Sequence, residues 1–357
     1  MNITFLIGNG FDVNLGLNSK YTDFYPYYIE STKDLDDDNI IKKFSSKIKD
    51  NYETWGDFES AFAKNACGTA ENVRDILYDF SSKFAQYLKT QTELCDYSND
   101  ENLSKFRYFL INGHNYLEDK HTQIISSIYN NANENITVNF VNFNYTDTLT
   151  RLIYSYKSKH NIDVLRDFIY NSHKLKESFG ETLHIHGALG GNIIIGTSSK
   201  DQFSDDNLKN DPAVAKYCVK SAVNNYIGKA VIEEKFKEMI NSSRIIYSYG
   251  LSFGESDKSR WDVISNWIRK DQSHKLVIYK LGTGFEKYNR AYLPLLYDAI
   301  DDCRKSYLSV LGFNEDELAK YLDQIFVIDS SNVLDFKLID TKSKATDKDK
   351  EINSVKV

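Results

Sequence analysis

The sequence ITFLI at residues 3–7 is followed directly by GNGFD at residues 8–12. The first stretch is a short apolar run, which is typical of a strand buried inside a parallel sheet. The glycines predict a tight turn that lets the backbone approach a pyrophosphate, whose charge then meets the N–H groups that open a helix. This order predicts a nucleotide site formed by Gly8, Asn9, Gly10 and Phe11. A strand-to-helix turn without a ligand is the alternative.

Composition narrows the class of protein. The chain has 357 residues and a net charge of −7, and no run of five or six basic residues occurs, which disfavours broad capture of nucleic acid. The four cysteines are scattered singly, so they indicate neither a disulfide framework nor a zinc ribbon. We therefore expect a cytoplasmic protein. We also expect no signal peptide and no membrane contact, because no long apolar run is present.

Short apolar runs alternate with longer helical stretches, which is the pattern of a doubly wound α/β sheet. The fold class predicted is thus α/β, with a mostly parallel, Rossmann-like sheet and helical insertions. The expected strands cover residues 3–7, 136–143, 182–186, 192–196, 244–249, 275–280 and 325–328.

The spacing of aromatic residues divides the chain further. Residues 21–132 carry aromatics at helical spacing and are predicted to form a helical insertion. The nucleotide-binding core would then comprise residues 1–20 and 133–340, with a second helical insertion at 206–241. Both insertions could cover the nucleotide end of the sheet. Residues 341–357 are too polar to bury and are predicted to be a disordered tail.

A second candidate site segment is VNFNYTDTL at residues 141–149, a strand end followed by a helix start. Ligands of open α/β sheets bind at such carboxyl ends. The Asn144 amide could orient a carboxamide or a water molecule, whereas Asp147 could cap the following helix. Ordinary helix capping by both residues is the alternative.

A third segment is LHIHG at residues 183–187. On a strand, His184 and His186 would project to one face. A neutral imidazole is a suitable general base at cell pH, and Gly187 beside it would leave room for a substrate. A metal-binding pair and a purely structural pair of histidines are the alternatives; we expect no metal.

A fourth segment is YGLSFGESD at residues 249–257, again a strand end with a glycine and serine turn. Gly250 and Ser252 could bind ribose or phosphate there. A doubly wound sheet gathers the carboxyl ends of its strands along one edge, so these turns are expected to form one site.

These segments, together with YTDF at 21–24 and WGDFE at 55–59, resemble the AbiH family of bacterial phage abortive-infection proteins over most of residues 1–265. More remotely, the series is similar to the sirtuin-like NAD-binding proteins of antiphage systems, many of which cleave NAD. That resemblance implies that Gly8 and Gly10 hold the pyrophosphate and Asn144 lies by the nicotinamide ribose. It also implies that His186 is the general base and that Ser252 approaches the adenine ribose.

The resulting hypothesis is an antiphage effector that hydrolyses the nicotinamide–ribose bond of NAD. Asn144 would clamp the carboxamide, His186 would act as base, and Asp12 or Asp147 would steady the developing charge or the imidazole. The insertion that carries Trp55 and Glu59 would close over the pocket. The sequence leaves open a phage-derived trigger or partner, homo-oligomer assembly, a nucleotide sensor without catalysis, and a nuclease with Asp12, Glu59, Asp147 and His186 around a metal.

Overall fold

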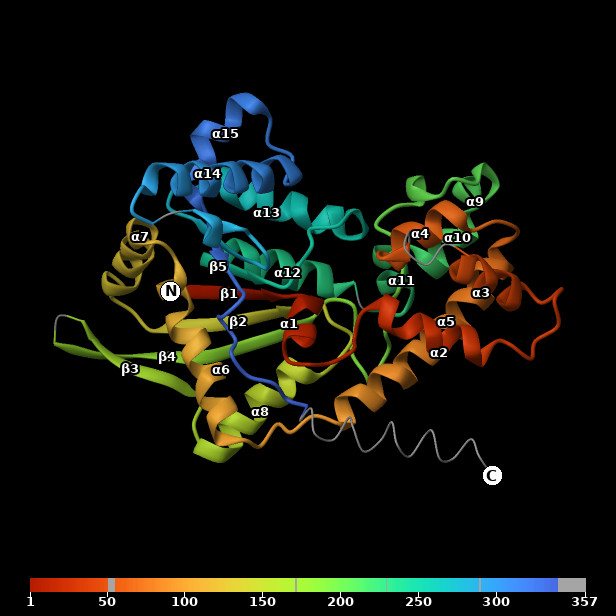
Figure 1. Cartoon of the computed structure of the whole chain (residues 1–357), viewed down its shortest axis with the longest axis horizontal. Coiled ribbons are helices and arrows are strands. Elements are labelled where there is room, and N and C mark those ends of the chain that lie inside the picture. Colours follow the sequence, from red (N-terminus) through yellow and green to blue (C-terminus); the bar gives the residue numbers. More distant parts are fainter. Residues whose placement is uncertain (51–54, 171, 229, 289, 340–357) are drawn as a thin grey trace.

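A seven-stranded sheet forms the centre of the protein in the computed structural model, which describes residues 1–50, 55–170, 172–228, 230–288 and 290–339 (Figure 1). The order of the strands is β3-β4-β2-β1-β5-β6-β7. All neighbouring strands run parallel except β3 and β4, which form an antiparallel hairpin. The strands are β1 (Asn2–Ile7), β2 (Ile136–Asn142), β3 (Val164–Tyr170), β4 (His173–His184), β5 (Ser243–Tyr249), β6 (Lys275–Lys280) and β7 (Ile325–Asp329).

The six parallel strands confirm the predicted mostly parallel α/β sheet. Their order, β4-β2-β1-β5-β6-β7, is that of a Rossmann-like fold, in which the chain first builds outward on one side of β1 and then on the other. The order reverses between β1 and β5, so the carboxyl ends of these two strands flank the position where open α/β sheets bind ligands.

Helices cover both faces of the sheet, and alternate side chains of each strand separate the two cores. Phe5 points into a core built with α1 (Asn9–Asn14), α6 (Asp100–Asn112), α7 (Asp119–Asn130) and α8 (Thr148–His160). Leu6, the next residue, points into the other core, with α12 (Val231–Ser242), α13 (Lys258–Lys270), α14 (Leu293–Val310) and α15 (Glu315–Tyr321). This period of two explains why the strand is apolar throughout.

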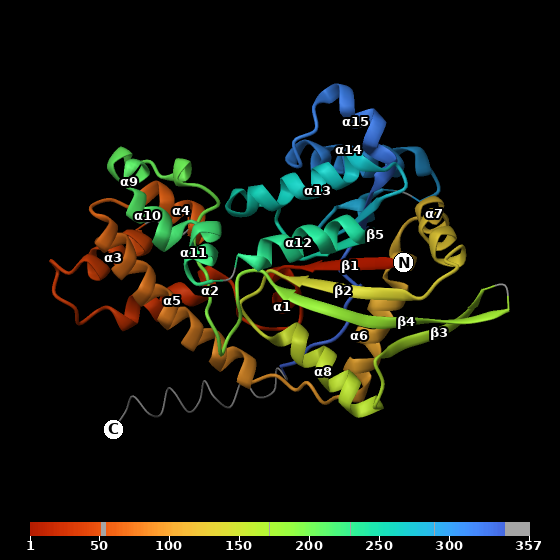
Figure 2. The same cartoon turned by 180° about the vertical axis from the view of Figure 1, so that it is seen from behind.

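The remaining helices form a lobe beside the sheet, visible from both sides (Figures 1 and 2). The helical lobe consists of α2 (Tyr21–Ser31), α3 (Ile40–Asp50), α4 (Phe58–Asn65), α5 (Ala70–Glu93), α9 (Asp206–Asn210), α10 (Pro212–Cys218) and α11 (Lys220–Tyr226). Its core is aromatic, with the rings of Phe58 and Phe80 stacked at 3.7 Å. Segments more than a hundred residues apart thus share one hydrophobic cluster.

Each predicted insertion therefore divides into helices that belong to the lobe and helices that pack on the sheet. Within residues 21–132, α2 to α5 belong to the lobe, whereas α6 and α7 bury side chains against the sheet. Within 206–241, α9 to α11 belong to the lobe and α12 lies on the sheet. The predicted disordered tail, residues 341–357, lies outside the described residues.

The observed strands differ from the predicted ones at two places in the chain. β3 and the first half of β4 were missed, because the hairpin projects beyond β2 and carries charged residues such as Lys174 and Lys176 instead of an apolar run. Residues 192–196 form no strand; Ile193 makes a single bridge to Gly187. Ile195 is buried in the hydrophobic cluster of the lobe, so the apolar character of this segment serves packing of the lobe instead of a strand.

Candidate functional site

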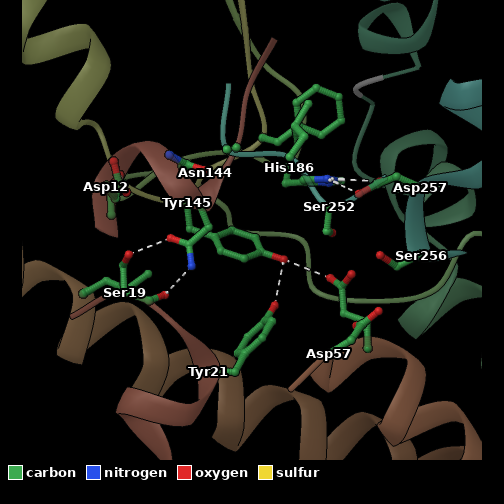
Figure 3. Close-up of a pocket in the computed structure, with 18 of the residues that line it drawn as sticks. Asp12, Ser19, Tyr21, Asp57, Asn144, Tyr145, His186, Ser252, Ser256 and Asp257 are labelled. Atoms are coloured by element: carbon green, nitrogen blue, oxygen red, sulfur yellow. Dashed lines mark hydrogen bonds and ion pairs between the residues drawn. The ribbon is translucent and has the colours of Figure 1, made fainter. Parts of the chain in front are cut away.

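A cavity of about 270 Å³ lies at the carboxyl ends of β1, β2, β4 and β5, under the helical lobe. Each strand contributes the turn that follows it, and the lobe contributes the opposite wall (Figure 3). Among the predicted site residues, those that line the cavity are Asp12, Asn144, His186, Gly8, Asn9, Gly250 and Ser252. The structure therefore brings together residues from all four segments singled out in the sequence.

The glycine turns are packed against each other. The Gly8 N–H donates to the Tyr249 carbonyl at 2.8 Å, and the Gly10 N–H donates to the Gly250 carbonyl at 3.0 Å. A Cβ atom on Gly8 would lie 2.5 Å from a Leu251 methyl carbon. The absence of side chains at these positions thus permits contact between the two turns.

Four predicted residues lie outside the lining of the cavity. Gly10 lines a neighbouring cavity, and Phe11 is fully buried in the core beside Phe106 and Tyr249. Asp147 precedes α8 and forms an ion pair with Arg151 at 2.7 Å. Gly187 has φ +77° and turns the chain beside Asn192, whose carbonyl leaves no room for a Cβ.

Asp12 and Asn144 form one polar end of the cavity. Asp12 is 1% exposed, and the Thr146 hydroxyl donates to its Oδ2 at 2.5 Å. Burial, with a smaller contribution from the charge of Asp147, raises the pKa of Asp12 to about 7, although the Thr146 and Asn144 side chains oppose that rise. Asp12 Oδ1 and both polar side-chain atoms of Asn144 are buried and make no hydrogen bond of normal geometry among the described residues, although the Asn144 side chain lies close enough to Asp12 to lower the pKa of its carboxyl. Buried polar groups are normally hydrogen-bonded, so these atoms mark an incompletely satisfied polar region beside the cavity.

His186 and Asp257 form the second polar group. His186 Nε2 lies 3.1 Å from Asp257 Oδ1, and the contact joins the turns after β4 and β5 (Figure 3). Burial lowers the pKa of His186 to about 3, although the negative charge of Asp257 acts in the opposite direction and raises it. Burial also works against ionisation of Asp257, yet His186, Lys220 and Arg260 hold its pKa well below the usual value. A neutral His186 beside an ionised Asp257 donates from Nε2, which leaves Nδ1 as a proton acceptor.

His184 lies in a different environment from His186. Its Nε2 is 2.8 Å from the Thr150 hydroxyl on α8, and its Nδ1 is 3.4 Å from Asn142 Nδ2. The two histidines therefore do not converge on one point. Within the described ranges, no group of three or more His, Cys, Asp or Glu side chains is arranged to hold a metal ion.

The lobe supplies Tyr21, Glu59 and Lys220 to the wall of the cavity, and of these only Lys220 lies outside the motifs found in the sequence. The Tyr145 hydroxyl donates to Glu59 Oε1 at 3.0 Å and accepts from the Tyr21 hydroxyl at 3.3 Å. Lys220 Nζ lies 2.8 Å from Glu59 Oε2. Glu59 was expected over the pocket and does line it, whereas Trp55 is buried in the core of the lobe. Lys220 lies in no recognisable motif, because its importance comes from a partner 161 residues away.

The comparison with protein families agrees with the motifs. Residues 4–279 match the family described as Bacteriophage abortive infection AbiH, a span that contains every residue of the cavity. None of the curated proteins matches the chain. In the described part of the chain, no helix combines the length and the apolar character needed to cross a membrane. The chain belongs to the AbiH family of bacteriophage abortive-infection proteins.

Proposed function

We propose that this protein acts in abortive infection by binding NAD in the cavity and hydrolysing its nicotinamide–ribose bond. The observation that carries the proposal is that Asp12, Asn144 and His186 line one cavity at the switch point of a Rossmann-like sheet, and that each has a buried polar atom without a hydrogen bond of normal geometry among the described residues. Such a position is where doubly wound sheets bind nucleotides.

The size and charge of the neighbouring space suit a dinucleotide. A second cavity, of about 540 Å³, shares Asn9, Gly250, Leu251 and Ser252 with the first. Lys20, Lys280 and Lys337 line this second cavity, and none of its described lining residues is acidic. The first cavity would take the nicotinamide ribose, and the lysines of the second would favour the phosphates.

The chemistry assigns a role to each polar group. Rupture of the C1′–N bond sends its electron pair to the nicotinamide nitrogen and develops positive charge on the ribose. The carboxylates around the cavity would stabilise that charge, and the Asn144 amide would bind the carboxamide. His186 Nδ1 would accept the proton of the water that adds to C1′. The products are nicotinamide and ADP-ribose.

Binding of NAD without turnover is a second candidate, favoured by one observation. A histidine whose pKa is lowered to about 3 is a weak base at neutral pH. A nucleotide sensor that acts through a partner needs the cavity but not a base. The nuclease hypothesis has less support, since Glu59 is paired with Lys220 and Asp147 with Arg151, which leaves these carboxylates with counter-ions other than a metal.

Incubation of the purified protein with NAD tests the proposal, with RNA and DNA offered in parallel, each with and without Mg²⁺. We expect nicotinamide and ADP-ribose in equal amounts and intact nucleic acids. In cells that express the protein, phage infection should deplete NAD, because an abortive-infection effector must be restrained before infection. NAD that binds and stays intact in both settings would favour the sensor, and degraded nucleic acid would favour the nuclease.

A further inference from the structure

Lys220 is a buried cation at the junction between the lobe and the sheet. Its exposed fraction is 2%, and Nζ lies 2.8 Å from Glu59 Oε2 and 3.2 Å from Asp257 Oδ1. A lysine is almost never buried to this extent unless it is paired. Lys220 therefore bridges a carboxylate of the lobe and the carboxylate that contacts His186.

The backbone around Lys220 is fixed by several contacts. Its N–H donates to the Thr197 carbonyl at 2.9 Å, and the Thr197 N–H donates to the Cys218 carbonyl at 2.7 Å. A Cβ atom on Gly196 would lie 2.1 Å from that same Cys218 carbonyl, so only glycine fits this approach. The segment after the His186 turn thus determines where Lys220 enters the site.

Glu59 is held as firmly as Lys220. Its Oε1 accepts from the Gly196 N–H at 3.2 Å and from the Tyr145 hydroxyl at 3.0 Å, while Oε2 faces Lys220. Donors from three separate segments thus converge on one carboxylate of α4. Glu59 is 5% exposed, so little solvent screens these contacts.

The charged groups around His186 and its partner Asp257 come from five elements, because Glu59 lies on α4 and Lys220 on α11. Asp257, in the short 3₁₀ helix Glu255–Asp257, also accepts from Arg260 of α13 at 2.5 Å. Arg260 in turn pairs with Glu233 of α12 at 2.7 Å. Without Lys220, the carboxylates of Glu59 and Asp257 would have no shared cation between them. Arg260 would still neutralise Asp257, but Glu59 would lose its counter-ion.

We propose that Lys220 and Glu59 form a latch through which the helical lobe positions the His186–Asp257 pair. Lys220 is a positioning residue in this arrangement, since it holds the Asp257 carboxylate where that group accepts a hydrogen bond from His186 Nε2. The pair is then complete only when the lobe is seated on the sheet. For its effect on turnover this inference rests on the proposed hydrolysis, but the state of His186 can be measured without any activity.

The test compares Lys220→Met with the wild type by NMR of ring-¹⁵N-labelled histidine; the chain has 7 histidines, and His186→Gln identifies the signal of His186. In the wild type we expect the neutral ring with the proton on Nε2. Loss of the Lys220 charge should raise the titration midpoint of His186 and mix its tautomers. Lys216→Met is the matched control, because Lys216 lies four residues earlier and contacts the Tyr226 ring instead of a carboxylate.

With NAD, Lys220→Met should lower kcat at least tenfold with KM changed less than threefold, since the group acts on the base and not on binding. If the buried carboxylates left by Lys220→Met prevent folding, Glu59→Gln with Lys220→Met removes one charge of each sign, and the same readouts apply. A folded variant with wild-type His186 signals would overturn the latch. A wild type that leaves NAD intact would instead remove the proposed hydrolysis, and the ring signals would still decide on the latch.

Discussion

Gly10 and Gly250 are in backbone contact: a Cβ atom on Gly10 would lie 2.6 Å from the Cα atom of Gly250. Gly250 has φ +71°, so it also adopts a backbone conformation that other residues rarely reach. The contact joins the turns after β1 and β5, the two strands between which the order of the sheet reverses. A side chain at either position would therefore clash with the opposite turn, whether or not a ligand is bound.

This contact changes what Gly10→Val should do. Because the turns must separate, we expect the variant to lose about 1–3 kcal/mol of stability, the usual cost of overpacking, as well as nucleotide binding. Thermal unfolding measures the effect. Gly56→Ala is the control, since no atom of the described residues lies within 4 Å of the added Cβ and no positive φ is involved; its Tm should match the wild type. An unchanged Tm in Gly10→Val would show that the turns are free to move apart.

Asp12 should give the protein a distinct dependence of stability on pH. Its pKa is raised from 3.8 to about 7 in the folded state, so the native carboxyl keeps its proton where the unfolded one has lost it. Stability from this group is therefore greatest below pH 4, falls between pH 4 and 7, and is level above pH 7. Asp12→Asn should remove that fall. Urea unfolding at intervals of pH compares the two proteins, and parallel curves would contradict the assignment.

The two histidines should differ in their effect on turnover. His186→Ala should lower the rate of NAD hydrolysis by roughly 10²–10⁴-fold, the usual contribution of a positioned acid–base group. His184→Ala should cost much less, because His184 contacts Thr150 and Asn142 outside the cavity lining. The measurement is nicotinamide release by the folded variants. Equal losses of rate in the two variants would mean that the histidines support the structure at the end of β4 and that His186 is not the base.

The strands that are buried on both faces are the parts of the fold that the sequence reveals most clearly. β1, β2 and β5 are apolar because both faces are covered, and this made them predictable within two residues. The hairpin β3–β4 has no such cover over its outer half, so its residues carried no apolar signal. In the site, the turn glycines, Asn144 and His186 are local features that a sequence displays.

The partners of those residues are not local features. His186 meets Asp257 across 71 residues, and the sequence could indicate each of them only as a separate polar residue at a strand end. Phe11 follows the glycine turn but faces the core, because α1 places it under the sheet next to Phe106. Contacts of this kind depend on how the lobe and the turns pack together, which no single segment encodes.

Substitution of Asn144 should distinguish the binding of NAD from its hydrolysis. The backbone N–H of Asn144 is fixed by the Asn142 side chain at 3.1 Å. Its own amide makes no hydrogen bond of normal geometry within the described residues and acts only on the pKa of the nearby Asp12, so Asn144→Ala should leave the turn intact and remove only the amide. We expect the variant to keep most of its affinity for NAD, because the phosphates lie elsewhere, and to lose turnover. Calorimetry measures the affinity, and saturation at 100 times Kd should stabilise both proteins by about 2.7 kcal/mol. Wild-type turnover in the variant would remove Asn144 from the reaction, and NAD that stabilises neither protein at millimolar concentration would remove NAD as the ligand.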